Sequence, residues 1–138
     1  MAINRREARE AVFELLFETE FKCDEAAEEI FALSTDNREI ESNDYIRGVY
    51  FGVCEKMDEI DATIERHSNG WKVSRLTRVS RAVIRLCVYE MAYVKDVPCA
   101  VAINEAIELS KKYDDDKARG FVNGVLNGIK TELEAHAE

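Results

Sequence analysis

Apolar residues recur at helical spacing through the second half of the chain, and this pattern constrains the fold more than any other feature. Three segments show it: residues 79–93, 101–109 and 121–129. Their apolar side chains are three or four positions apart, which places them on one side of an α-helix. The stripes are Val79, Val83, Leu86 or Cys87, Glu90 and Tyr93, with Ala82 and Tyr89 beside them; Val101, Ala102, Glu105, Ala106 and Leu109, widened by Ile103 and Ile107; and Phe121, Val122, Val125, Leu126 and Ile129. Because only short breaks separate the segments, we expect three helices that bury one shared core.

The first half of the chain is expected to be helical as well. Asn4 is suited to cap a first helix over about residues 5–21, because asparagine oxygen accepts hydrogen bonds from the free amides of a first turn. A second helix is predicted over 25–33, with Asp24 as its cap. A third is predicted as one uninterrupted helix over 44–67. With the second half, this gives an all-α fold.

Short connections join the helices of the second half. Gly70 is suited to the left-handed conformation that ends a helix, and residues 71–76 are expected to form a turn and one short helical piece. Thr77 is the predicted N-cap of the helix over 79–93. Pro98 is well placed just before the next helix. Asp116 is the expected cap of the last helix.

Length and composition favour a single domain without a membrane anchor. A chain of 138 residues with one proline suits one domain, which we expect in two helical halves of about 1–70 and 71–138. No apolar run approaches the length of a membrane span and the N-terminus is polar, so a cytoplasmic location is expected. The four cysteines lie far apart without a CxxC pair, so we expect reduced thiols and no bound metal.

The sequence favours a binding protein over an enzyme. It contains no glycine-rich phosphate loop, no GxSxG and no HExxH motif. Glu105 and Glu108 lie three positions apart, but no Glu-x-x-His pair accompanies them, so a di-metal site is not expected. We therefore predict neither catalysis nor a cofactor.

Charge is distributed unevenly along the chain. Residues 24–69 hold four basic against thirteen acidic residues, which equals the whole net charge of −9. Residues 71–98 hold six basic against two acidic residues. An acidic chain disfavours strong general binding to nucleic acid, whereas a local basic surface suits weak or assisted binding. The acidic segment is equally well explained as a solvated face.

Three groups of basic residues are candidates for that surface. One group lies on the first turns of the first helix. The partial positive charge of the helix N-terminus disfavours cations there, but the helix end and the cations together would attract a phosphate group. A second forms a stripe on the helix over 79–93, and a third flanks the acidic turn at 114–116. Ordinary surface positions remain the alternative for all of them. The groups are Arg5, Arg6 and Arg9; Arg78, Arg81 and Arg85; and Lys117 and Arg119. If the first helix begins near the acidic turn, the first and third groups would form one patch.

Several phrases of the sequence resemble the NusB family of bacterial transcription antitermination factors. The most specific are VPCAVAINEAIELSKKY at 97–113 and FVNGVL at 121–126. The likeness extends upstream through WKVSRLTRVS at 71–80 and RREAREAVFELLFETEF at 5–21. Only about residues 24–60 match mainly in pattern. The resemblance implies an all-α bundle of about seven helices in two packed helical subdomains.

The resemblance also implies a function and partners. Such proteins pair with NusE, a ribosomal protein of the small subunit, bind single-stranded boxA RNA of nascent ribosomal transcripts, and act in the RNA polymerase antitermination complex. It places RNA binding at Arg5, Arg6, Arg9, Lys117 and Arg119, although Glu7 stands where some relatives carry another arginine. The expected NusE-binding residues are Ser80, Arg81, Glu105 and Phe121.

Two alternatives accompany this interpretation. One is a homodimeric helical scaffold in which the RNA and NusE surfaces are masked. The other is the N-terminal domain of a methyltransferase, since some of these enzymes carry a NusB-like domain. The methyltransferase is disfavoured because the sequence ends where a cofactor-binding domain would have to begin.

Overall fold

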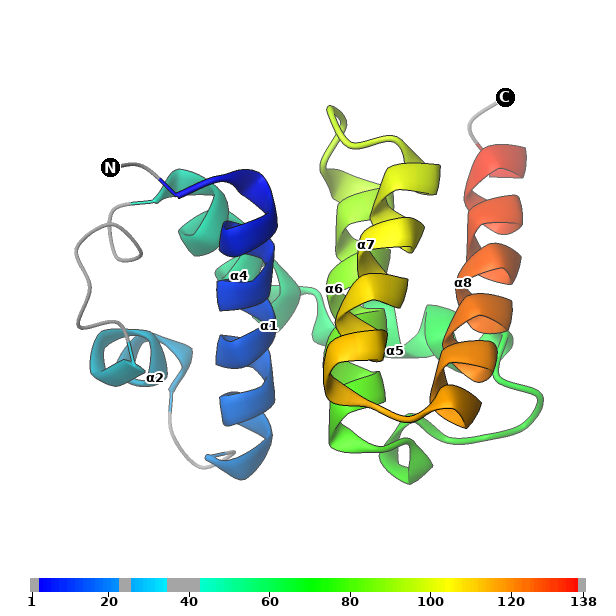
Figure 1. Cartoon of the computed structure of the whole chain (residues 1–138), viewed down its shortest axis with the longest axis horizontal. Helices are drawn as coiled ribbons and strands as arrows, with labels where there is room; N and C mark the ends of the chain where they lie inside the picture. The colour runs from blue at the N-terminus through cyan, green and yellow to red at the C-terminus, as the bar shows by residue number, and fades with distance from the viewer. Residues whose placement is uncertain (1–2, 23–25, 35–42, 137–138) are drawn as a thin grey trace. The chain divides into compact units, whose positions relative to one another are not determined.

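The computed structural model describes residues 3–22, 26–34 and 43–136, and over these ranges it is helical without a β-strand (Figure 1). The chain divides into two compact units, Met1–Glu55 and Lys56–Glu138. The first contains α1 (Arg5–Phe21), α2 (Ala27–Ser34) and α4 (Asp44–Glu55). The second contains α5 (Met57–Arg66), the 3₁₀ helix η1 (Val73–Arg75), α6 (Arg78–Tyr93), α7 (Cys99–Tyr113) and α8 (Asp116–His136). The predicted all-α class with about seven helices is confirmed. None of these helices is long and apolar enough to cross a membrane.

The first helix begins as predicted, with Asn4 as its cap. The Asn4 side chain accepts a hydrogen bond from the Glu7 amide at 2.8 Å, and the Glu7 carboxylate accepts one from the Asn4 amide at 3.5 Å. This reciprocal pair satisfies two amides that the first turn leaves free. Glu7 therefore has a structural role at the helix start. The proposed cap of the second helix, Asp24, lies outside the described residues.

The core of the first unit forms where α1 packs against α2 and α4. At its centre lies Tyr50, whose hydroxyl is 2.8 Å from the Thr19 hydroxyl. Thr19 in turn donates to the carbonyl of Leu15 at 2.8 Å, so Tyr50 is the donor of the pair. Burial raises the pKa of the Tyr50 phenol, which keeps it a neutral donor. The aliphatic and aromatic residues around this pair are Val12, Phe13, Leu16, Ile30, Phe31, Ile46 and Val53.

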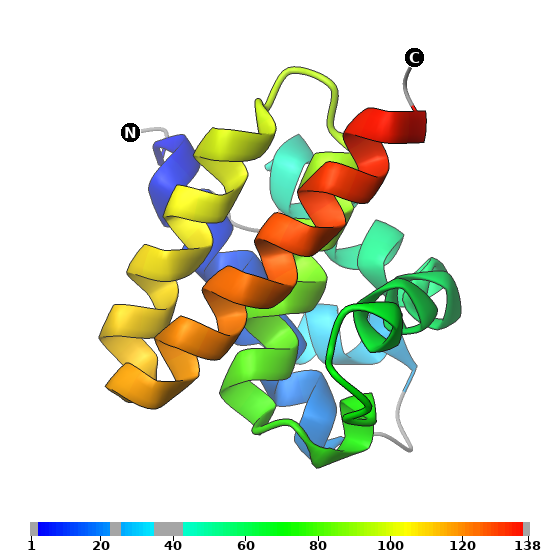
Figure 2. The ribbon, with the colours of Figure 1, turned by 90° about the vertical axis from the view of Figure 1, so that its right-hand side faces the viewer.

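The second unit is built around α6, which contacts α5, α7 and α8 (Figure 2). Because neighbours cover several of its sides, its buried surface is wider than the single stripe that the sequence predicted. Ile84 and Val88 are buried along with Val83 and Leu86, whereas Tyr93 at the helix end is exposed. Spacing alone identifies one face of a helix, and a central helix has more than one buried face.

Most residues of the stripes on the two following helices are buried as predicted. On α8, Val122, Val125, Leu126 and Ile129 are buried, whereas Phe121 at the start of the stripe is only half-buried. On α7, by contrast, Val101 is 46 % exposed, so its assignment to the buried stripe was wrong. It lies in the first turn of α7, where the helix has only just begun.

The prediction of one uninterrupted helix over 44–67 was also wrong. The helix is interrupted at Lys56, whose φ of −97° and ψ of 14° lie outside the helical region, and α5 begins at the next residue. The division between the two compact units falls at the same point. The two helical halves expected from the sequence, about 1–70 and 71–138, stay a prediction. The helices on either side serve different cores: α4 packs in the first unit, whereas α5 packs against α6 and α8.

Most caps and turns of the second unit match the prediction. The Thr77 hydroxyl accepts from the Ser80 amide at 3.0 Å, and Gly70 has the positive φ of 86° expected of it. The cap of α8 was assigned wrongly, however. It is Asp115, whose carboxylate accepts from the Ala118 amide at 2.9 Å, whereas Asp116 forms an ion pair with Arg119. In a run of three aspartates the composition alone does not fix which one caps the helix.

An ion-pair cluster joins α5 to α8. Glu132 accepts hydrogen bonds from Arg66 at 2.7 Å and contacts the His67 ring nitrogen Nε2 at 2.9 Å. Gly128 allows this approach, because a Cβ there would lie 2.8 Å from Nδ1 of His67. The hydrogen bond from Arg66, together with that from His67, lowers the pKa of Glu132 to about 2.

The lowered pKa of Glu132 indicates how the stability of the folded protein depends on pH. The lowered pKa means that Glu132 contributes stability above its unfolded pKa of about 4.5, and that this contribution is lost as the pH falls towards 2. Glu132→Gln should therefore lower the melting temperature at pH 7, and the difference from the unchanged chain should shrink between about pH 5 and pH 2. Glu134→Gln, on an exposed position of the same helix, is the matched control. A pH-independent difference for Glu132→Gln would contradict this assignment.

Candidate RNA and partner surfaces

The start of α1 presents two of its three arginines to solvent. Arg5 and Arg6 are exposed, and the guanidinium carbon of Arg5 lies 4.4 Å from the centre of the Tyr45 ring. This distance is typical of a cation–π contact, which orients the Arg5 side chain. Arg9 is only 4 % exposed. Arg5 and Arg6 are therefore the members of this group that are accessible to a ligand in this conformation.

The two basic residues beside the acidic turn differ in their surroundings. Lys117 is exposed near the start of α8, whereas Arg119 is half-buried and paired with Asp116. Both belong to the second unit, and the α1 arginines belong to the first. A single patch formed by the two groups remains a prediction.

The predicted arginine stripe on α6 has three different environments. Arg78 is exposed, and Arg81 is half-buried, with Nη1 3.5 Å and 3.4 Å from the carbonyl oxygens of Val73 and Ser74. Arg85 donates to both carboxylate oxygens of Asp61 at 2.8 Å and 2.9 Å, which joins α6 to α5. Such a two-point contact fixes the guanidinium, so Arg85 has a structural role.

Two of the expected partner-binding residues face inward. Ser80 is buried, and its hydroxyl donates to Asp114 at 3.0 Å, which ties the start of α6 to the end of α7. Glu105 is also buried, at 8 % exposure. Arg81 and Phe121 are half-buried and so retain accessible surface. A direct contact with a partner is therefore better suited to Arg81 and Phe121 than to Ser80 and Glu105.

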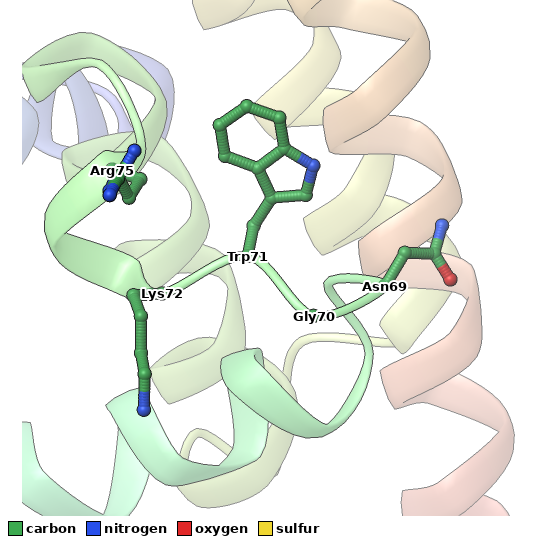
Figure 3. Close-up of a pocket in the computed structure, with 5 residues that line it drawn as sticks. All are labelled: Asn69, Gly70, Trp71, Lys72 and Arg75. Atoms are coloured by element: carbon green, nitrogen blue, oxygen red, sulfur yellow. The ribbon is translucent and has the colours of Figure 1, made fainter.

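The loop between α5 and α6 carries a feature that the sequence analysis did not select. An open pocket of about 330 Å³ lies there, lined by Asn69, Gly70, Trp71, Lys72 and Arg75 (Figure 3). Trp71 is the one tryptophan of the chain and is 54 % exposed. The sequence does contain a signal for this site, because Trp71 lies close to Lys72 and Arg75 in a segment without acidic residues.

The fold defines an all-α protein with two helical units and exposed basic positions in each. The chain belongs to the NusB family, whose model matches residues 6–131. A protein of Enterococcus faecalis named "Transcription antitermination protein NusB" is 41 % identical, over 98 % of this chain and 94 % of its own length. A protein of Bacillus subtilis with the same name is 42 % identical, over 96 % and 98 %.

Solved structures share the fold. NusB of T. maritima matches with a TM-score of 0.87 and 38 % identity, covering 96 % of this chain and 94 % of that one. A second match is a crystal structure of the antitermination factors NusB and NusE in complex with dsRNA, at a TM-score of 0.78 and 29 % identity. It covers 93 % of this chain and 96 % of the matched one.

Proposed function

We propose that this protein is a transcription antitermination factor that binds boxA RNA of nascent ribosomal transcripts together with NusE. The observation that carries this proposal is the family match, which extends over both helical units. In this role the protein acts in the cytoplasm as one domain, by binding and without catalysis. The expected result of this binding is a change in transcript elongation by RNA polymerase.

The charge distribution supports an RNA surface that depends on a partner. A net charge of −9 repels phosphate at long range, while Arg5 and Arg6 offer a local attraction. Lys117 and Arg119 are the proposed contribution of the second unit. NusE would supply the remaining contacts and the sequence preference, because phosphate contacts position a strand and base contacts select it.

Co-purification with the organism's own NusE, followed by RNA binding with and without NusE, tests this proposal. We expect a stable heterodimer that binds single-stranded boxA RNA more tightly than a scrambled strand or a duplex of the same length. Light scattering on the protein alone reports whether it self-associates. A homodimer that neither dissociates with NusE nor binds boxA RNA would contradict the proposal and support the masked scaffold.

We propose that NusE binds the second unit at Arg81 and Phe121, with Ser80 and Glu105 acting indirectly by holding their helices. The Ser80–Asp114 hydrogen bond supports this division of roles, because it fixes the helix on which Arg81 lies. Phe121 would supply apolar contact area, which aromatic residues commonly provide at interfaces.

Arg81→Glu is therefore expected to weaken the NusE complex by about tenfold or more, because it puts a carboxylate where a cation is expected to meet the partner. The dissociation constant measured by calorimetry is the readout. Arg78→Glu, three positions earlier on the same helix, makes the same charge change on an exposed arginine and serves as the control. Equal losses for both variants would indicate general repulsion, and a loss of helix content in Arg81→Glu would show that its contacts with Val73 and Ser74 maintain the fold.

A further inference from the structure

The α5–α6 loop is held in place on both sides of its exposed tryptophan. Before Trp71, Ser68 is buried and its hydroxyl donates to the Ile64 carbonyl at 2.6 Å. After it, Val73 is buried and its amide donates to the Glu65 carboxylate at 2.8 Å. The Trp71 amide itself donates to the Ser68 carbonyl at 2.9 Å. These hydrogen bonds and buried residues hold the backbone of the loop in place. The indole ring of Trp71 is exposed and is not part of the hydrophobic core.

The surroundings of the indole are basic. No aspartate or glutamate occurs between Glu65 and Glu90, and Lys72, Arg75 and Arg78 are exposed. Of the carboxylates on the neighbouring elements, Asp61 is paired with the cation Arg85, whereas Glu65 and Asp114 accept hydrogen bonds from neutral donors, the Val73 amide and the Ser80 hydroxyl. A ligand at this pocket therefore meets an aromatic face and positive charge.

The side chains of the pocket point in different directions. The Trp71 indole and the Arg75 guanidinium lie on the same side of the loop, whereas the Lys72 side chain points to the opposite side (Figure 3). An aromatic ring next to a cation is the arrangement by which single-stranded nucleic acid is held, because the base stacks on the ring and the cation attracts the phosphate.

We propose that this pocket binds one unpaired nucleobase of single-stranded RNA, with Trp71 as the stacking face and Arg75 as the phosphate contact. The inference rests on the proposed function for the identity of the ligand, and it adds an RNA contact in the second unit that is separate from the α1 arginines. A protein ligand is less well matched, because the pocket combines its one large aromatic with cations and offers no further large apolar side chain.

Fluorescence of the single tryptophan tests this proposal directly, since all indole emission comes from Trp71. The complete chain is titrated at low salt with an oligoadenylate of about eight nucleotides, and separately with a blunt-ended GC-rich RNA duplex of about twelve base pairs, which stays paired under these conditions. We expect saturable quenching by the single strand and little by the duplex, whose bases are not available for stacking. Equal quenching by both forms, or none by the single strand, would overturn the proposal.

Single substitutions test the role of each side chain in binding. Binding is measured by fluorescence anisotropy of a labelled RNA single strand. Trp71→Ala should weaken binding by on the order of 10- to 100-fold, and Trp71→Phe should retain most of it. Arg75→Ala should flatten the slope of log affinity against log salt by about 0.7, the value for one phosphate contact with a single strand. Lys95→Ala, which removes an equal charge from an exposed position outside the pocket, should leave both quenching and affinity unchanged. Unchanged circular dichroism shows that each variant is folded.

The outcomes separate this inference from the function on which it rests. If NusE-dependent boxA binding is present but Trp71 is not quenched, the pocket assignment is wrong and the proposed function stands. If Trp71 is quenched by NusE and not by RNA, the loop is a protein interface and the inference is again wrong. If Trp71 is quenched by the single strand while boxA recognition with NusE is absent, the pocket assignment stands and the proposed function fails.

Discussion

Leu86→Ala is expected to lower the free energy of unfolding of the second unit by about 2–5 kcal/mol, the usual range for truncating a buried leucine. Leu86 is 1 % exposed and lies on α6, the helix that contacts α5, α7 and α8. The substitution deletes buried apolar atoms of the side chain. It also leaves a cavity, which the neighbouring helices fill only partly. Chemical denaturation followed by circular dichroism measures the loss.

Val101→Ala is the matched control for this prediction. Val101 belonged to an expected buried stripe, but it lies exposed in the first turn of α7. Its truncation should change the unfolding free energy by less than about 0.5 kcal/mol, as is usual for surface positions. A large loss at Val101 together with a small loss at Leu86 would contradict the packing of α6 and α7 in the structure.

Helix positions could be predicted well from the sequence because apolar spacing and caps are local signals. Asn4 and Thr77 cap their helices as expected, and the α8 stripe is buried as expected apart from Phe121. The interruption at Lys56 carries no such signal. Ile60 and Ile64 continue the spacing of the preceding stripe, and neither glycine nor proline marks the break. The break is set by long-range packing, since α4 and α5 belong to different units.

The candidate site was less predictable because exposure depends on tertiary structure. Arg6 and Arg9 look equivalent in the sequence, yet Arg6 is exposed and Arg9 is buried. Similarly, Arg81 and Arg85 lie four positions apart, but only Arg85 makes a two-point contact with Asp61. Residues far away in the chain decide which arginine contacts another helix. The spacing of the arginines along the sequence therefore does not reveal these contacts.

Replacement of Arg5 and Arg6 together by alanine is expected to cause the largest loss of RNA binding. If each contacts one phosphate, the slope of log affinity against log salt for the NusE complex should flatten by about 1.4, at about 0.7 per contact with a single strand. The loss should be similar for matched and mismatched boxA strands, because these contacts position the strand without reading its bases. Filter binding over a range of salt concentrations measures the slope.

Two further variants show whether this effect belongs to the start of α1. Lys22→Ala removes a cation just beyond the other end of the helix, where Lys22 is paired with Glu18 at 2.8 Å, and should leave the slope unchanged. Arg9→Ala should also leave the slope unchanged and should lower thermal stability instead, because the guanidinium is buried. A flattened slope in Arg9→Ala would mean that RNA binding exposes this arginine. An unchanged slope in the Arg5 and Arg6 double variant, with its helix content intact, would place the RNA elsewhere on the protein.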